Sequence, residues 1–237
     1  MFVKNFYHCD QGKVVFTRQQ ASDFAKQVAD DFNPLHDIDA KRFCVPGDLL
    51  FAVTLAKAGI YNEMRFNFAG MVTNDIVLSF PENIDQKADV TDDKGKTYLS
   101  VEASGESSKN SDFIESLIKA YVGFSGHTFP HLLVNLMEEN NVMINPARPM
   151  IMYESMSLHI NDLSATDVNL TLSETSLKVE GKRGNAELCF NLYSGDKLVG
   201  KGEKHMVLSG LREYCHQTMS TISADYLALK KAYTAAV

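Results

Sequence analysis

The chain has 237 residues, of which 45% are hydrophobic and 22% are charged, and its formal net charge is −7. This composition allows one large domain or two small ones, each with a buried core, and it excludes wholesale disorder. An acidic chain without a block of Lys and Arg gives no reason to expect nucleic-acid binding. An anionic ligand would therefore need a local basic patch.

The cysteines Cys9, Cys44, Cys189 and Cys215 are widely spaced and form no Cys-x-x-Cys pair. We therefore expect neither a zinc site nor a disulfide framework, but reduced thiols in a cytoplasmic protein. The N-terminus has no basic region followed by an apolar stretch, so no signal peptide is expected. The longest apolar stretch, 49–56, is much shorter than the roughly 20 residues that span a bilayer, so we expect no membrane span.

The N-terminal segment predicts two short strands followed by a helix. Val, Phe and Tyr are frequent in residues 2–7 and 13–16, on either side of a turn, which is typical of strands. Thr17 and Gln20 then form a capping-box pattern, and apolar residues follow at helical spacing. We therefore predict a helix over residues 18–30.

A second helix follows a short connection. The Asn-Pro pair at 33–34 ends the first helix, because a residue before proline is pushed out of the helical region. Pro-Gly-Asp at 46–48 begins the next helix, where an early aspartate suits the positive end of the helix dipole. Residues 49–56 are apolar on nearly every face, which is typical of a buried helix that Gly59 can end.

The rest of the chain predicts strands, and the order of elements recurs. Residues 64–105 show strand patterns around a polar hairpin turn at 92–96, and the polar residues 104–111 predict a loop. Helices and strands are then expected again, at 112–121 (helix), from Pro130 (apolar helix), at 150–160, 168–179, 187–193 and 199–208 (strands) and over 220–237 (helix).

The recurring order indicates two similar α+β units. A sheet wrapped around an apolar helix buries the faces of both elements, so one helix and its strands can form a unit. We predict an N-terminal domain over 1–106 and a C-terminal domain with a final helix over 107–237.

The segment Asp31-Phe32-Asn33-Pro34-Leu35-His36 has the form D-x-N-P-L-H and directly follows the capped helix. It resembles the hydratase motif of the MaoC-like, (R)-specific enoyl-CoA hydratases, in which an aspartate and a histidine five residues later flank a water. The four residues Asp, Asn, Pro and His arise at this fixed spacing by chance at roughly one in 10⁵ per position, given residue frequencies near 5%. The resemblance implies a tandem (double) hot-dog fold, in which each antiparallel sheet wraps around a buried central helix.

The resemblance also implies a reaction. Asp31 and His36 would orient a water that adds to a trans-2-enoyl thioester, and Asn33 would hold the turn between them. Gly47 would offer its backbone N–H to the thioester oxygen, because the first amides of a helix lack partners. The implied partner is acyl-CoA or another acyl thioester, with coenzyme A part of the substrate and no metal or redox cofactor. The chain would form an intrachain pseudo-dimer, and a further homodimer is left open.

The chain departs from the family pattern near the motif. The family's Ser/Thr-Gly before the aspartate is Ala-Asp here, and its small residue six places after the histidine is Arg42. The connection 36–47 is short, with Pro46 where the family has histidine, so an acyl-chain preference cannot be carried over. Asp48, beside the expected oxyanion position, would oppose an enolate unless it is turned away or paired.

Other functions stay open. The spacing of Asp31 and His36 favours a hydratase over a hot-dog acyl-CoA thioesterase, whereas the short connection and Asp48 favour a non-catalytic acyl-CoA or lipid-binding protein. A protein-interaction scaffold is a further alternative. The second half lacks the motif, and His127 and His131 have no evident carboxylate partner in the local sequence. We therefore expect a structural second half.

Overall fold

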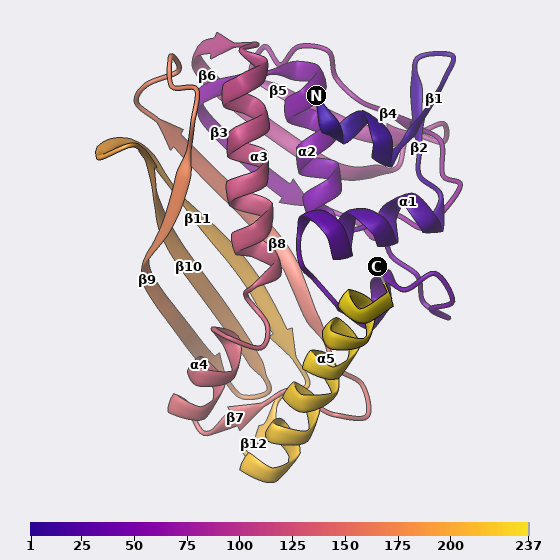
Figure 1. The fold of residues 1–237 in the computed structure, drawn as a ribbon, viewed down its shortest axis with the longest axis vertical. Coiled ribbons are helices and arrows are strands. Elements are labelled where there is room, and N and C mark those ends of the chain that lie inside the picture. The colour runs from indigo at the N-terminus through magenta and orange to yellow at the C-terminus, as the bar shows by residue number, and fades with distance from the viewer. Residues whose placement is uncertain (237) are drawn as a thin grey trace.

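The computed structural model describes residues 1–236, and one antiparallel sheet organises them (Figure 1). The first-half and second-half strands meet where Ile60–Phe68 pairs with Ile151–Ile160. Within the described residues the sheet has ten strands, in the order β1 (His8–Asp10), β2 (Lys13–Val15), β4 (Leu78–Ser79), β5 (Lys87–Asp92), β6 (Thr97–Ser108), β3 (Ile60–Phe68), β8 (Ile151–Ile160), β11 (Lys197–Ser209), β10 (Arg183–Ser194) and β9 (Asn169–Glu180).

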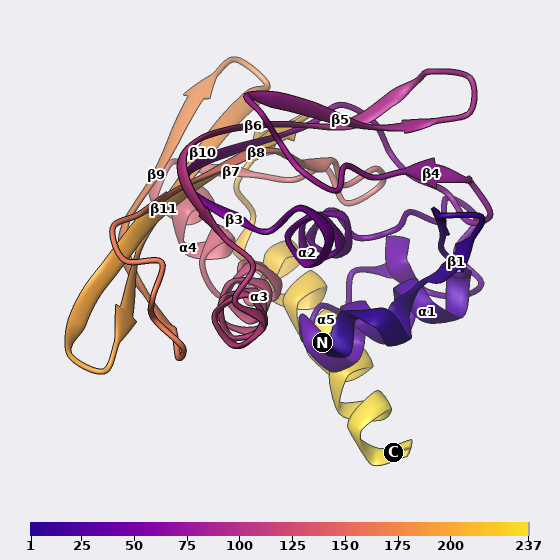
Figure 2. The same cartoon turned by 90° about the horizontal axis from the view of Figure 1, so that it is seen from above.

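Two helices, one from each half, lie side by side against one face of this sheet (Figures 1 and 2). They are α2 (Gly47–Ala58) and α3 (Ser111–Gly126). Nine of the twelve residues of α2 are buried, which confirms the prediction of a buried helix. The rings of Phe51 and Tyr121 join the two helices with centroids 4.9 Å apart, and Phe190 continues the contact at 5.6 Å. The main hydrophobic core is therefore shared by both halves of the chain.

The helical segment before the motif is confirmed. It consists of α1 (Arg18–Asp23) and a π-helical turn, η2 (Phe24–Val28). The capping box is complete, because the backbone N–H of Gln20 donates to Thr17 Oγ1 at 3.1 Å and that of Thr17 donates to Gln20 Oε1 at 3.2 Å.

Three predictions about local structure were wrong. Residues Phe2–Phe6 form a 3₁₀ helix, η1, instead of a strand, because the Phe6 ring packs edge-to-face on both Phe2 and Phe24. The predicted loop at 104–111 is mostly ordered, since β6 continues to Ser108 and α3 begins at Ser111. The boundary predicted between 106 and 107 lies inside β6, and the division into domains stays a prediction.

The third difference concerns the helix that matches α2 in the second half. We expected the apolar helix after Pro130 to be the second-half counterpart of α2. Instead, α3 is the helix that lies beside α2. The later helix is short, α4 (Leu133–Glu139), and packs in a separate small core. Next to it a two-stranded sheet pairs β7 (Val142–Met143) with β12 (Arg212–Glu213).

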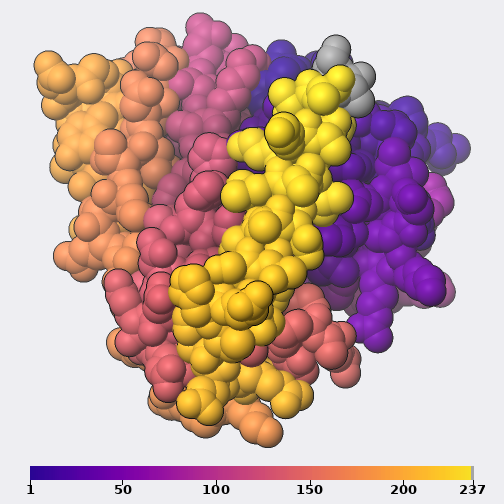
Figure 3. Space-filling view, turned by 60° about the horizontal axis from the view of Figure 1, so that its bottom comes forward, coloured from indigo at the N-terminus to yellow at the C-terminus, as the bar shows by residue number. Residues whose placement is uncertain are grey.

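A long C-terminal helix, α5 (His216–Ala236), crosses the surface between the two halves (Figure 3). It confirms the predicted helical tail over residues 220–236 and begins four residues earlier than expected, while Val237 lies outside the described residues. No helix in residues 1–236 has the length and hydrophobicity that a membrane crossing requires.

Gly126, in the last turn of α3, lies against the end of the helical segment that leads to the motif. A Cβ atom at this position would come within 1.7 Å of the Ala29 carbonyl oxygen. Glycine therefore allows α3 to approach the backbone directly before Asp31. Gly123 lies in the same helix, and a Cβ there would meet nothing within 4 Å.

We expect Gly126→Ala to lower the free energy of unfolding by about 2–3 kcal/mol, because the added methyl group overpacks the contact with Ala29. Gly123→Ala is the matched control, and its better helix propensity should raise stability by about 0.5–1 kcal/mol. Urea denaturation of both variants measures the difference. Equal effects of the two substitutions would contradict the close contact at Gly126.

Candidate functional site

The backbone turns sharply after η2 and so brings the motif residues together. Asp30 has a left-handed φ of +55°, and the Asp31 N–H donates to the Ala25 carbonyl oxygen at 2.8 Å. The short helix η3 (Pro34–His36) follows, and Asn33 caps it by accepting from the Leu35 N–H at 3.1 Å. Asn33 therefore holds the turn, as the motif implies.

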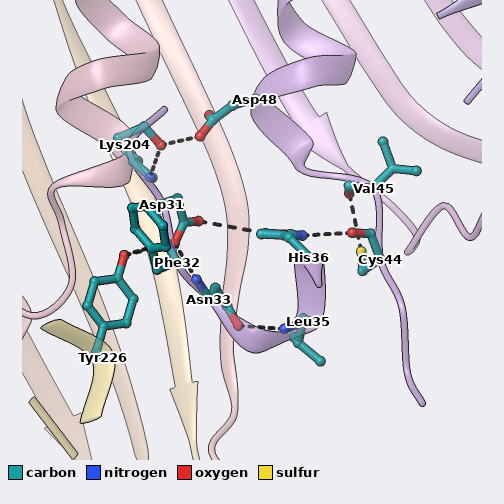
Figure 4. Close-up of polar contacts among 11 residues, drawn as sticks. Asp31, Phe32, Asn33, Leu35, His36, Cys44, Val45, Asp48, Lys204 and Tyr226 are labelled. Atoms are coloured by element: carbon teal, nitrogen blue, oxygen red, sulfur yellow. Dashed lines mark hydrogen bonds and ion pairs between the residues drawn. The ribbon is translucent and has the colours of Figure 1, made fainter. Parts of the chain in front are cut away.

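Asp31 and His36 face each other across this turn (Figure 4). His36 Nε2 lies 3.7 Å from Asp31 Oδ2, which is too long for a direct hydrogen bond. A single water can reach both atoms at ordinary hydrogen-bond distances across this gap. The side chains are 12% (His36) and 26% (Asp31) exposed, so the pair is shielded but remains accessible to water.

The backbone fixes the orientation of the His36 ring. Nδ1 lies 2.7 Å from the Cys44 carbonyl oxygen, which can only accept a hydrogen bond. Nδ1 is therefore the protonated nitrogen of the neutral ring, and Nε2 is left as an acceptor directed at Asp31. In this tautomer His36 can take a proton at the atom that faces the carboxylate.

Asp31 is held from its other side by Tyr226 of α5. Asp31 Oδ1 accepts from the Asn33 N–H at 2.9 Å and from the Tyr226 hydroxyl at 3.0 Å, and this leaves Oδ2 toward His36. The Phe32 N–H donates to the same Tyr226 oxygen at 2.9 Å. Burial and then the charge of Asp31 raise the pKa of Tyr226, so the phenol stays protonated and donates. No sequence pattern in the tail indicated this residue.

Further contacts fasten α5 over the motif. Asp30 accepts hydrogen bonds from Lys230 and, at 2.7 Å, from His127 Nε2. The Phe32 ring packs edge-to-face against Tyr226, with centroids 6.4 Å apart. His127 thus does have a carboxylate partner, but 97 residues away in the sequence, which the local pattern could not reveal.

A buried polar network lies next to the pair (Figure 4). Ser125 Oγ donates to Asp48 Oδ2 at 2.5 Å and accepts from Lys204 Nζ at 2.5 Å. Asp48 is therefore hydrogen-bonded to Ser125, which links it indirectly to the Lys204 ammonium group. Burial raises the pKa of Asp48 and lowers that of Lys204, and the charge of each partner opposes these shifts. Neither Ser125 nor Lys204 was identified from the sequence.

Gly47 lies at the N-terminal end of α2, where helix amides lack intrahelical partners. Aromatic rings enclose its free face, since a Cβ atom would lie 3.1 Å from the Phe68 ring and 3.3 Å from the Tyr153 ring. Asp48 follows it in the first turn of the same helix. The helix terminus, Asp48 and the residues from the second half therefore border the same small region.

Two cavities lie on the described surface, and neither lining includes Asp31 or His36. One, of about 850 Å³, opens over the face of the sheet opposite the helices. The other, of about 620 Å³, is lined by Phe124, Leu172 and His131, among others.

A group of side chains that could bind a metal lies over the outer face of the sheet. Donor atoms of Glu187, Cys189 and Glu203 lie within 4.8 Å of one another there. Strand pairing assembles this group, so Cys spacing could not predict it.

Comparison with known proteins assigns a family. Residues 1–217 match the family described as "Protein of unknown function (DUF3581)". The chain belongs to this DUF3581 family. No curated protein matches it. The DUF3581 match ends where α5 begins, so Tyr226 lies beyond the matched residues.

Three solved structures are similar to this DUF3581 chain at low identity. The acyl-CoA thioesterase II TesB2 from Mycobacterium marinum has 9% identity and a TM-score of 0.40, with 72% of this chain and 90% of that chain covered. A conserved hot-dog protein of unknown function from Alicyclobacillus acidocaldarius has 9% identity and a TM-score of 0.45, with coverages of 88% and 98%. A putative oleoyl thioesterase from Lactobacillus plantarum has 7% identity and a TM-score of 0.36, with coverages of 85% and 92%. The resemblance to MaoC-like hydratases stays a prediction from the motif.

We expect Tyr226→Phe to lower the free energy of unfolding by about 1–3 kcal/mol, because it removes a hydrogen bond to a carboxylate and leaves the Phe32 N–H unpaired. Tyr233→Phe is the control in the same helix, since within residues 1–236 the Tyr233 hydroxyl has one hydrogen bond, which it accepts from the exposed Gln27 amide at 3.2 Å. Its effect should stay below about 0.5 kcal/mol. Chemical denaturation compares the two, and a larger loss for Tyr233→Phe would exclude Tyr226 as the main anchor.

Proposed function

We propose that this chain is an enoyl-thioester hydratase/dehydratase that adds water to a trans-2-enoyl-CoA. The observation that carries the proposal is the 3.7 Å gap between Asp31 Oδ2 and His36 Nε2. The other polar atom of each side chain already has a hydrogen-bond partner: Asp31 Oδ1 accepts from Tyr226, and His36 Nδ1 donates to the Cys44 carbonyl oxygen. Such a pair can orient one water and move its proton, as general acid–base catalysis requires. No metal or redox cofactor is needed for this chemistry.

The reaction can be written with these residues. His36 Nε2 takes a proton from the bound water while Asp31 orients that water and stabilises the imidazolium. The water oxygen bonds to the β-carbon, and the thioester oxygen gains negative charge as an enolate. The N–H groups at Gly47 and the start of α2 favour that charge. The proton held by His36 is then delivered to the α-carbon, which completes the addition of H and OH.

The residues around the pair support a tandem hot-dog arrangement with one site at the seam. Asp31 and His36 come from the first half, whereas Ser125, Lys204 and Tyr226 come from the second half and border them. We propose domains over 1–106 and 107–237 that act as an intrachain pseudo-dimer. The partner is an acyl thioester, the protein is cytoplasmic, and assembly into a homodimer stays open.

Thioester hydrolysis is the second candidate. Asp48 lies in the first turn of α2, and its Oδ1 has no hydrogen-bond partner within the described residues. A carboxylate in this position could hold a water against a thioester carbonyl. The two reactions differ in product, because hydrolysis releases the CoA thiol and hydration does not.

The test is an assay of the purified protein with crotonyl-CoA and a longer enoyl-CoA, followed by loss of the conjugated enoyl absorbance. Asp31→Asn and His36→Ala should each lower kcat by about 10²–10⁴-fold, the usual contribution of a general acid or base. His159→Ala is the matched control, because this exposed histidine pairs with Glu63 on the sheet and should retain full activity.

Other outcomes separate the alternatives. Release of free thiol would replace the hydratase proposal with the thioesterase. Saturable binding of both thioesters without turnover would instead establish a non-catalytic binding protein. Activity that survives both Asp31→Asn and His36→Ala would remove these residues from the mechanism.

A further inference from the structure

Three buried polar side chains from three different elements meet beside the candidate pair. Asp48 in α2 is 9% exposed, Ser125 in α3 is 6% exposed and Lys204 in β11 is 3% exposed. Within residues 1–236 no ion pair joins Asp48 directly to Lys204, and the Ser125 hydroxyl bridges them instead. Two buried charges without direct contact are costly to desolvate, and such groups often mark functional sites.

Lys204 is placed so that one cation acts on two carboxylates. Its charge interacts with Asp48 and, more weakly, with Asp31, and its Nζ lies 4.5 Å from the centre of the Tyr153 ring. His36 and Tyr121 also interact with Asp48. When both carboxylates and Lys204 are ionised and His36 is neutral, these groups carry a net charge of −1, and without Lys204 it would be −2.

This charge count matters for the proposed reaction. The enolate oxygen adds a further negative charge close to Asp31 and the first turn of α2. Unlike charges nearby stabilise such an oxygen, and like charges oppose it strongly in a site shielded from water. An uncompensated Asp48 carboxylate in the same helical turn would cancel the favourable effect of the helix dipole.

We propose that Lys204 is a positioning residue of this site: through Ser125 it holds and neutralises Asp48, so that the N-terminus of α2 can bind an oxygen that becomes negative. The inference rests on the proposed enoyl-thioester chemistry and deepens it. It predicts that removal of Lys204 lowers activity because the Asp48 carboxylate then lacks a compensating positive charge. Removal of that carboxylate as well should therefore restore much of the activity.

The experiment uses Lys204→Met, Asp48→Asn, the double variant and Lys204→Arg in the full chain. Lys204→Met should lower kcat for crotonyl-CoA by about 10²-fold, the size expected for loss of one transition-state charge interaction, and leave KM within about threefold. The double variant should regain at least about tenfold over Lys204→Met, and Lys204→Arg should stay within about tenfold of the wild type. Lys201→Met, an exposed lysine on the same strand, is the matched control and should keep full activity.

A second readout does not depend on turnover. Acetoacetyl-CoA ionises to an enolate that has a distinct ultraviolet absorbance, and the wild type should bind it with an increased enolate fraction. Lys204→Met should lose this increase and the double variant should recover it. Circular dichroism at the assay temperature confirms that every variant is folded, so that a loss of signal reports on the site.

The outcomes separate this inference from the proposed function. Enolate stabilisation without hydration in the wild type would contradict the hydratase proposal but still support the role of Lys204. Hydration in the wild type together with an undiminished enolate signal in Lys204→Met would overturn the role of Lys204 alone. A double variant no better than Lys204→Met in both measurements would also overturn it.

Discussion

The antiparallel pairing of β3 with β8 is the constraint on which the candidate site depends. This pairing joins the two halves into one sheet and sets α2 and α3 beside each other on the same face. In that arrangement Ser125 of α3 connects Lys204 of β11 to Asp48 at the start of α2. The shared aromatic core between the helices stabilises this geometry, so the polar network and the fold support each other.

Features encoded by neighbouring residues could be predicted from the sequence. The capping box, the buried α2 helix and the strands of the second half all depend on patterns within about ten residues, and all are confirmed. The turn that makes Asp31 and His36 converge is equally local, since Asn33 caps the helix that contains His36. The turn between them therefore follows from six consecutive residues, whereas Cys44 and Tyr226 orient the two side chains from outside it.

Features that depend on contacts between distant residues could not be predicted. Tyr226 meets Asp31 across 195 positions, and Lys204 meets Ser125 across 79. Nothing in the local sequence distinguishes that lysine from the exposed ones, because only strand register sends it inward. The helix that matches α2 was misplaced for the same reason: the apolar segment after Pro130 is locally convincing, but the sheet leaves it no position beside α2.

The contact between α5 and the motif also depends on the order in which the chain is synthesised. Asp31 is translated 195 residues before Tyr226, so its carboxylate gains this partner only after all of the sheet strands have been made. A nascent chain can form the first strands and α2 before Tyr226 is translated, and the Asp31 carboxylate gains its second anchor only afterwards. Until then, of these two donors, the Asn33 N–H alone holds Asp31 on this side.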